Sequence, residues 1–96
     1  MKIPLDLEAY QRTAVFTQDT VPKALLGTHD TKAGVWARLV VKQGRLKFYA
    51  EDTAEPRILD IGTDGWAKPQ QPHHISCDEP VRFYLEFYRK RRCEDD

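Results

Sequence analysis

The chain has 96 residues, with 15 Lys and Arg side chains balanced by 15 Asp and Glu. This length suits one domain, residues 1–96, and a zero net charge gives no overall attraction to nucleic acid or to an anionic membrane. Two cysteines, Cys77 and Cys93, are too few for a disulfide scaffold. No apolar stretch is long enough for a signal peptide or a membrane span. We therefore predict a cytoplasmic single-domain protein with free thiols that binds neither nucleic acid nor membrane.

Short apolar runs interrupted by Gly, Pro, Asp and Thr predict an all-β fold. The first predicted strand covers residues 10–16, and a loop-rich stretch follows it. Residues 35–42 and 45–50 are predicted to pair as an antiparallel hairpin around a turn at Gln43-Gly44. Alternation predicts that Val35, Ala37, Leu39 and Val41 share one face of the first of these strands, and that one face packs in the interior. The remaining predicted strands are 57–61, 66–68, 73–77 and 81–88, and residues 89–96 are predicted to be a charged tail. Closing these antiparallel strands into a barrel would remove exposed sheet edges, so we favour a closed or double-sheet barrel over an open sheet.

Three histidines, His29, His73 and His74, lie in or next to predicted turns. Neutral imidazole is a common ligand of Zn, Ni and Fe, and loops on a strand scaffold are suited to present it. Spacing alone equally allows surface or hydrogen-bonding histidines. The sequence around His73 favours metal binding: Gly65, Pro69, Pro72 and His73 resemble the second motif of cupins, in which a tight turn precedes a metal-binding histidine. In this register His73 points inward and His74 outward, and Gln70-Gln71 stand where cupins commonly have glycine.

A longer pattern resembles a specific family. It comprises His29-x-Thr31-Lys32-x-Gly34-Val35-Trp36, then Leu39, Val41, Gly44, Leu46 and Phe48-Tyr49, and later Pro69-Gln70 and His73. This pattern resembles the N-terminal domain of tellurite-resistance protein B and its stand-alone relatives. The resemblance implies a cupin-like double-stranded β-helix, or jelly-roll barrel, and a role in tolerance of tellurite or related chemical stress. Larger members also carry a methyltransferase that uses S-adenosylmethionine, but residues 62–65 are typical of a turn rather than of a cofactor loop, so methyl transfer is not expected of this chain.

The main functional hypothesis is a divalent metal, Zn, Ni or Fe, bound by His29 and His73 with Glu86 as the candidate third ligand. Such a metal would bind a small oxyanion or carboxylate. Alternation along residues 81–88 places Glu86 opposite the better interior face, which makes an ion pair or a partner interface the alternative for this residue. Trp36 and Arg38 are candidate pocket-lining residues, since Arg38 could stack on an aromatic ring or reach an anionic ligand. Cys77 is a further candidate ligand, with a small buried hydrophobe as the alternative.

Two other functional classes stay open. The first is a non-catalytic module that binds a small ligand without metal or forms a homodimer through Tyr84 and Tyr88. The second is a metal-dependent oxidoreductase, which typically requires two histidines and a carboxylate on Fe(II). We rank the oxidoreductase lowest and assign no catalytic residue.

Overall fold

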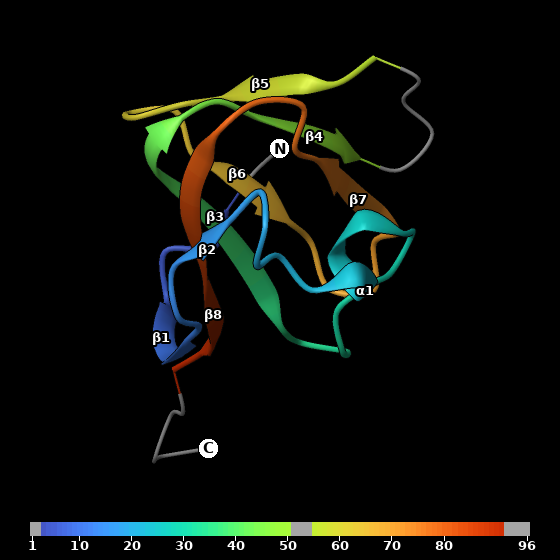
Figure 1. Ribbon diagram of the computed structural model, residues 1–96. Coiled ribbons are helices and arrows are strands. Elements are labelled where there is room, and N and C mark those ends of the chain that lie inside the picture. Colours follow the sequence, from blue (N-terminus) through green and yellow to red (C-terminus); the bar gives the residue numbers. More distant parts are fainter. Residues whose placement is uncertain (1–2, 51–54, 92–96) are drawn as a thin grey trace.

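The computed structural model describes residues 3–50 and 55–91, and strands dominate these residues (Figure 1). The predicted all-β class is confirmed, with one short helix added. In chain order the elements are β1 (Leu7–Arg12), β2 (Phe16–Thr17), α1 (Lys23–Leu26), β3 (Trp36–Gly44), β4 (Leu46–Ala50), β5 (Arg57–Leu59), β6 (Gly65–Ala67), β7 (His73–Ser76) and β8 (Val81–Lys90).

The strands form two antiparallel sheets. The larger sheet has the order β1-β8-β3-β6, with β2 also paired to β8, and the smaller sheet has the order β5-β4-β7. In Figure 1 the smaller sheet lies at the top and right, and the long strands β3 and β8 run down the left side. Within residues 3–50 and 55–91 the two sheets do not join into one closed barrel, so the predicted closure is not observed.

The predicted hairpin at Gln43-Gly44 is wrong. β3 pairs with β6 and β8, whereas β4 pairs with β5 and β7, so the chain crosses from one sheet to the other at this point. The β3–β8 register shifts between Val41 and Gln43, and Gly44 has a φ of +80°. A Cβ atom at Gly44 would collide with the carbonyl oxygen of Pro80. A glycine is therefore required here by a sheet crossing and a close backbone approach, not by a reversal of the chain.

β8 organises both ends of the chain. The predicted first strand is split into β1 and β2, and both pieces pair with β8. Between them, the backbone N–H of Thr13 donates to the Leu85 carbonyl at 2.9 Å, and the Thr13 hydroxyl accepts from the Leu85 N–H at 3.0 Å. β8 continues to Lys90, which pairs with Leu7, so the predicted tail begins as a strand. Residues 92–96 of that tail, including Cys93, lie outside the described residues.

The hydrophobic core lies where the inner faces of the strands meet. The predicted alternation is confirmed in β3, where Ala37, Leu39 and Val41 are buried, and in β8, where Val81, Phe83 and Leu85 are buried. Leu46, Phe48 and Ile75 contribute the core residues of β4 and β7. Burial of these side chains is the main source of stability in a domain this small, since there is no disulfide among the described residues.

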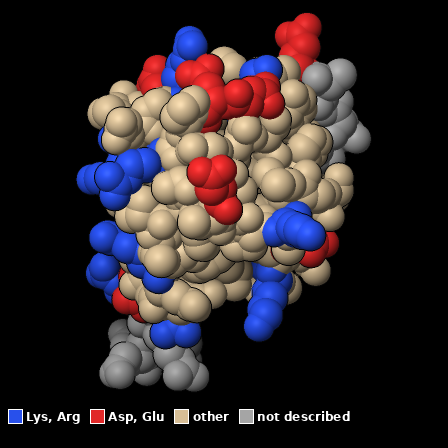
Figure 2. Space-filling view, viewed as in Figure 1, with Lys and Arg blue, Asp and Glu red and all other residues tan. Residues whose placement is uncertain are grey.

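The surface charges are distributed unevenly. On the face shown in Figure 2, acidic side chains gather mainly at the top, with another near the middle, and basic side chains lie along the left and lower margins, with others at the top and right. In the described part of the chain, no helix has the length and apolar character needed to cross a membrane.

Candidate functional site

The structure brings His29 and His73 into direct contact. Each backbone N–H donates to the carbonyl of the other, at 2.9 Å from His29 and 2.8 Å from His73, which makes an isolated antiparallel bridge. The two imidazole rings form an edge contact with centroids 4.2 Å apart. The predicted convergence of these two histidines is therefore observed.

The turn before His73 holds this arrangement in place. Gln70 adopts a φ of +59°, the left-handed conformation for which cupin turns commonly use glycine. Its backbone N–H donates to the Thr31 carbonyl at 3.1 Å. The Thr31 hydroxyl lies within donating distance of two carbonyls, that of Val35 at 2.8 Å and that of Lys68 at 3.1 Å, which share its single hydrogen. The threonine of the His-x-Thr-Lys pattern thus ties the loop that carries His29 to the turn that carries His73.

Backbone carbonyls fix the tautomer of both rings. His29 Nδ1 lies 2.9 Å from the Gly27 carbonyl oxygen, and His73 Nδ1 lies 2.7 Å from that of Gln71. A carbonyl oxygen can only accept, so each Nδ1 must carry a proton, and each Nε2 of a neutral ring presents its lone pair. His73 is only 3% exposed, as expected for its predicted inward position. Burial, followed by the neighbouring His29, lowers the pKa of His73 below its ordinary value and favours the neutral ring, against an opposing effect of the Gln71 hydrogen bond.

A cavity of about 350 Å³ opens beside the two histidines. One part of its lining is apolar and comes from α1, β3, β8 and the residue before β3: Leu25, Val35, Ala37, Leu85 and Phe87. The polar part includes the histidines and, on the exposed rim, Asp30 and Lys32. A concave site with a mostly apolar wall and a few convergent polar groups is typical of small-ligand binding.

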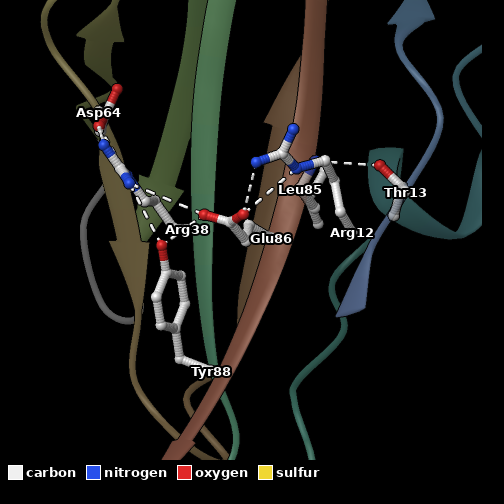
Figure 3. A network of polar contacts seen from close by, with 7 residues as sticks. All are labelled: Arg12, Thr13, Arg38, Asp64, Leu85, Glu86 and Tyr88. Carbon is white, nitrogen blue, oxygen red and sulfur yellow. Dashed lines mark hydrogen bonds and ion pairs between the residues drawn. The ribbon is translucent and has the colours of Figure 1, made fainter. Parts of the chain in front are cut away.

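Glu86 lies in a different place, on the outer face of the larger sheet (Figure 3). The register sets it between Arg12 of β1 and Arg38 of β3. Arg12 donates to its carboxylate at 2.8 and 3.2 Å, and the Tyr88 hydroxyl also donates to it. The hydrogen bond from Tyr88, followed by that from Arg12, holds the pKa of Glu86 below its ordinary value of 4.5. Its neighbours Leu85 and Phe87 line the histidine cavity, so alternation along β8 directs Glu86 away from it.

Trp36 and Arg38 also lie outside the lining of this cavity. Arg38 donates to Asp64 at 2.8 and 2.5 Å and to the Tyr88 hydroxyl at 3.2 Å, and its guanidinium lies 5.8 Å from the Trp66 ring centroid. Trp36 is half-buried and pairs in register with Tyr88. The outer face of this sheet therefore carries a network of Arg12, Glu86, Tyr88, Arg38 and Asp64. The structure thus agrees with the alternative prediction of an ion pair for Glu86 and with the predicted aromatic contact of Arg38.

Cys77 lines a second cavity of about 410 Å³, next to His74, whose ring stacks on Tyr49 with centroids 4.4 Å apart. Burial raises the pKa of the Cys77 thiol, which favours the protonated form that binds metals poorly. Its side chain packs against the core. Among residues 3–50 and 55–91, no three His, Cys, Asp or Glu side chains are grouped so that they could hold a metal ion.

Comparison with known proteins places this geometry in a family. The TehB-like domain family matches residues 11–85. The chain belongs to that family. This TehB-like domain is 41% identical over 92 residues to the probable S-adenosyl-L-methionine-dependent methyltransferase TehB of Haemophilus influenzae strain Rd, and 39% identical to its counterpart in strain 10810. Each alignment covers 90% of this chain and 32% of the relative, so the chain spans about a third of the length of these curated relatives.

Solved structures agree with the assignment. The crystal structure of TehB from Haemophilus influenzae has a TM-score of 0.78 and 29% identity, covering 90% of this chain and 32% of that one. A crystal structure of an Escherichia coli K12 protein has a TM-score of 0.83 and covers 96% of this chain and 99% of that one. At 24% identity, the second likeness is one of fold alone.

Proposed function

We propose that this TehB-like domain holds a divalent metal ion between His29 and His73 and binds a small oxyanion or carboxylate at the open positions of the metal. The observation that carries the proposal is the pair of Nδ1 contacts to the Gly27 and Gln71 carbonyls. Metal-ligating histidines almost always donate their other ring N–H to a carboxylate, carbonyl or water, which orients the ring and leaves the second nitrogen for the metal.

The donor set fits an open and weakly held metal site. Two neutral imidazoles suit Zn, Ni or Fe, but such metals take four to six ligands. The described residues supply no third protein ligand in place, and Glu86 is engaged with Arg12 and Tyr88. Water and the bound anion would complete the coordination, and the metal would polarise that anion as a Lewis acid. Lys32 and Asp30 both lie on the cavity rim, so their charges offset each other and the metal would supply the positive charge for the anion.

The wider role that we propose is recognition of an anion in tolerance of tellurite or related chemical stress, in the cytoplasm. Membership of the family supports it. The relatives are named as probable methyltransferases over chains about three times longer, and we propose binding rather than methyl transfer for this domain. We further propose that the two sheets are the two halves of a cupin-type jelly roll, with the histidine cavity at its mouth.

Metal analysis tests the metal site. Protein purified without an affinity tag or an immobilised-metal column would be titrated with Zn²⁺ and Ni²⁺, and its metal content measured. We expect near one metal per chain, lost in His29→Ala and in His73→Ala. His74→Ala is the matched control, because His74 belongs to the same strand but stacks on Tyr49, and it should keep the metal. Metal retained by His73→Ala would refute the ligand assignment.

A second candidate function, homodimerisation, has one observation in its favour. The outer face of the larger sheet carries half-buried aromatic side chains, with Trp66 and Tyr88 at a centroid distance of 5.0 Å and Arg12 over Tyr84 at 4.6 Å. Aromatic and Arg side chains are enriched in protein interfaces. Sedimentation at a range of concentrations would show a dimer weakened by Tyr84→Ala, whereas a monomer throughout would reject this candidate.

A further inference from the structure

We infer that the ligand of the histidine cavity is an amphipathic monocarboxylate, with a short alkyl or similar apolar tail, rather than an inorganic oxyanion. This inference rests on the proposed role of the cavity as a ligand site and names the class of ligand. It follows from the mixed lining of the cavity: the polar residues include both histidines, and the apolar residues come from three secondary-structure elements and the residue before β3.

One small side chain forms part of the apolar wall. Ala37 of β3 pairs in register with Phe87 of β8, and both residues line the cavity. Ala37 is 1% exposed, and its methyl group takes up less of the space than a larger side chain would. Leu25 and Val35 bound that space from α1 and from the residue before β3. An inorganic anion would leave this wall in contact with water.

The volume favours a ligand larger than an inorganic oxyanion. A cavity of about 350 Å³ corresponds to roughly twelve waters at ~30 Å³ each, which is more room than one small anion fills. An alkyl tail would occupy the remainder. Each CH₂ group that leaves water for an apolar wall should tighten binding about fourfold.

The ring tautomers make the carboxylate dependent on a cation. Because each Nδ1 is bonded to a carbonyl oxygen, each neutral ring has a lone pair, not an N–H, at its remaining nitrogen, and both rings line the cavity. Two lone pairs repel a carboxylate unless a metal ion lies between them. The head of the ligand would therefore bind the metal, and its tail would extend along the wall formed by Val35, Ala37 and Leu85.

Titration of a homologous series tests this inference. Acetate, butyrate, hexanoate, octanoate and tellurite would be added separately to Zn²⁺-loaded and to EDTA-treated protein, and backbone amide shifts followed by NMR. In the loaded protein we expect hexanoate to bind about fifteenfold tighter than butyrate, from two added CH₂ groups. Tellurite should bind no tighter than acetate.

A pair of isosteric substitutions on one segment locates the tail. Val35→Thr should reduce the gain in affinity for each CH₂ group added to the ligand, because Val35 lines the cavity. Val40→Thr is the control, since Val40 is half-buried on the outer face of β3. This substitution should leave the affinities of the carboxylates unchanged. Affinity independent of chain length, tellurite binding tighter than hexanoate, or no carboxylate binding would each overturn the ligand class even if Zn²⁺ binds. Length-dependent binding without bound Zn²⁺ would instead retain the ligand class and reject the metal.

Discussion

Glu86→Gln offers the sharpest test of how the outer network works. The substitution keeps the shape of the side chain and an acceptor for Tyr88 but removes the negative charge that Arg12 contacts at 2.8 Å and Arg38 at 3.8 Å. Glu86 is 9% exposed, so most of its interactions are shielded from water. We therefore expect the free energy of unfolding to fall measurably at neutral pH.

The magnitude follows from the exposure of the partners. Hydrogen bonds to charged groups contribute about 1.5–3 kcal/mol when buried, but exposed ion pairs contribute only about 0–1 kcal/mol. The Arg12 side chain is 59% exposed, and Arg38 keeps Asp64 as a partner. We expect a loss of about 1–2 kcal/mol at pH 7, which for a domain of this size lowers Tm by roughly 4–16 °C.

The loss should depend on pH in a defined direction. The folded-state pKa of Glu86 is depressed below 4.5, so its stabilisation is complete above that value and disappears as pH falls through the folded-state pKa. Urea unfolding at pH 7, 5, 4 and 3 should therefore show a gap between wild type and Glu86→Gln that narrows only below pH 4.5. A gap that stays constant down to pH 3, or no gap at pH 7, would refute this account of the network.

A matched control and a metal titration extend this test. Glu79→Gln removes a carboxylate that is 46% exposed and lies 3.3 Å from Arg45, and surface changes of this kind shift stability by no more than about 0.5 kcal/mol. Glu86→Gln should also bind Zn²⁺ like wild type, because the structure places Glu86 away from the histidine cavity. Loss of Zn²⁺ binding in a folded Glu86→Gln protein would instead support Glu86 as a metal ligand.

Two backbone positions give further predictions. Gly44→Ala should destabilise the fold by about 2 kcal/mol or more, because φ is +80° and the added Cβ meets the Pro80 carbonyl. A urea unfolding midpoint equal to that of the wild type would disprove the close approach. Gln70→Gly should stabilise by about 0.5 kcal/mol, since relief of a left-handed conformation worth about 1–2 kcal/mol is partly offset by the greater freedom of glycine in the unfolded chain. Its control, Gln71→Gly, loses the acceptor of the Lys68 N–H and should destabilise instead, and a destabilised Gln70→Gly would contradict the assigned strain.

The sequence by itself determined the family, the all-β class and the inward faces of β3 and β8. Alternation of side chains is a local property of an extended chain, so Ala37, Leu39 and Val41 could be assigned to the core without knowing what they pack against. The resemblance around Thr31 and Lys32 likewise depends on residues close in sequence, and the family match confirms it. The approach of His29 to His73 was predicted from the same resemblance, and the structure places the two rings in contact.

Tertiary structure alone decided which strands pair and what each polar side chain contacts. Gln43-Gly44 satisfies the local pattern of a hairpin turn, yet the chain passes to the other sheet, because partner choice depends on distant strands such as β7 and β8. Glu86 has Arg12 and Arg38 as neighbours because of the register in which three strands pair. That register cannot be read from the alternation of residues within one strand. The Nδ1 contacts depend on where the carbonyls of Gly27 and Gln71 point after folding, and so the feature that supports the metal proposal could not be predicted from the order of residues.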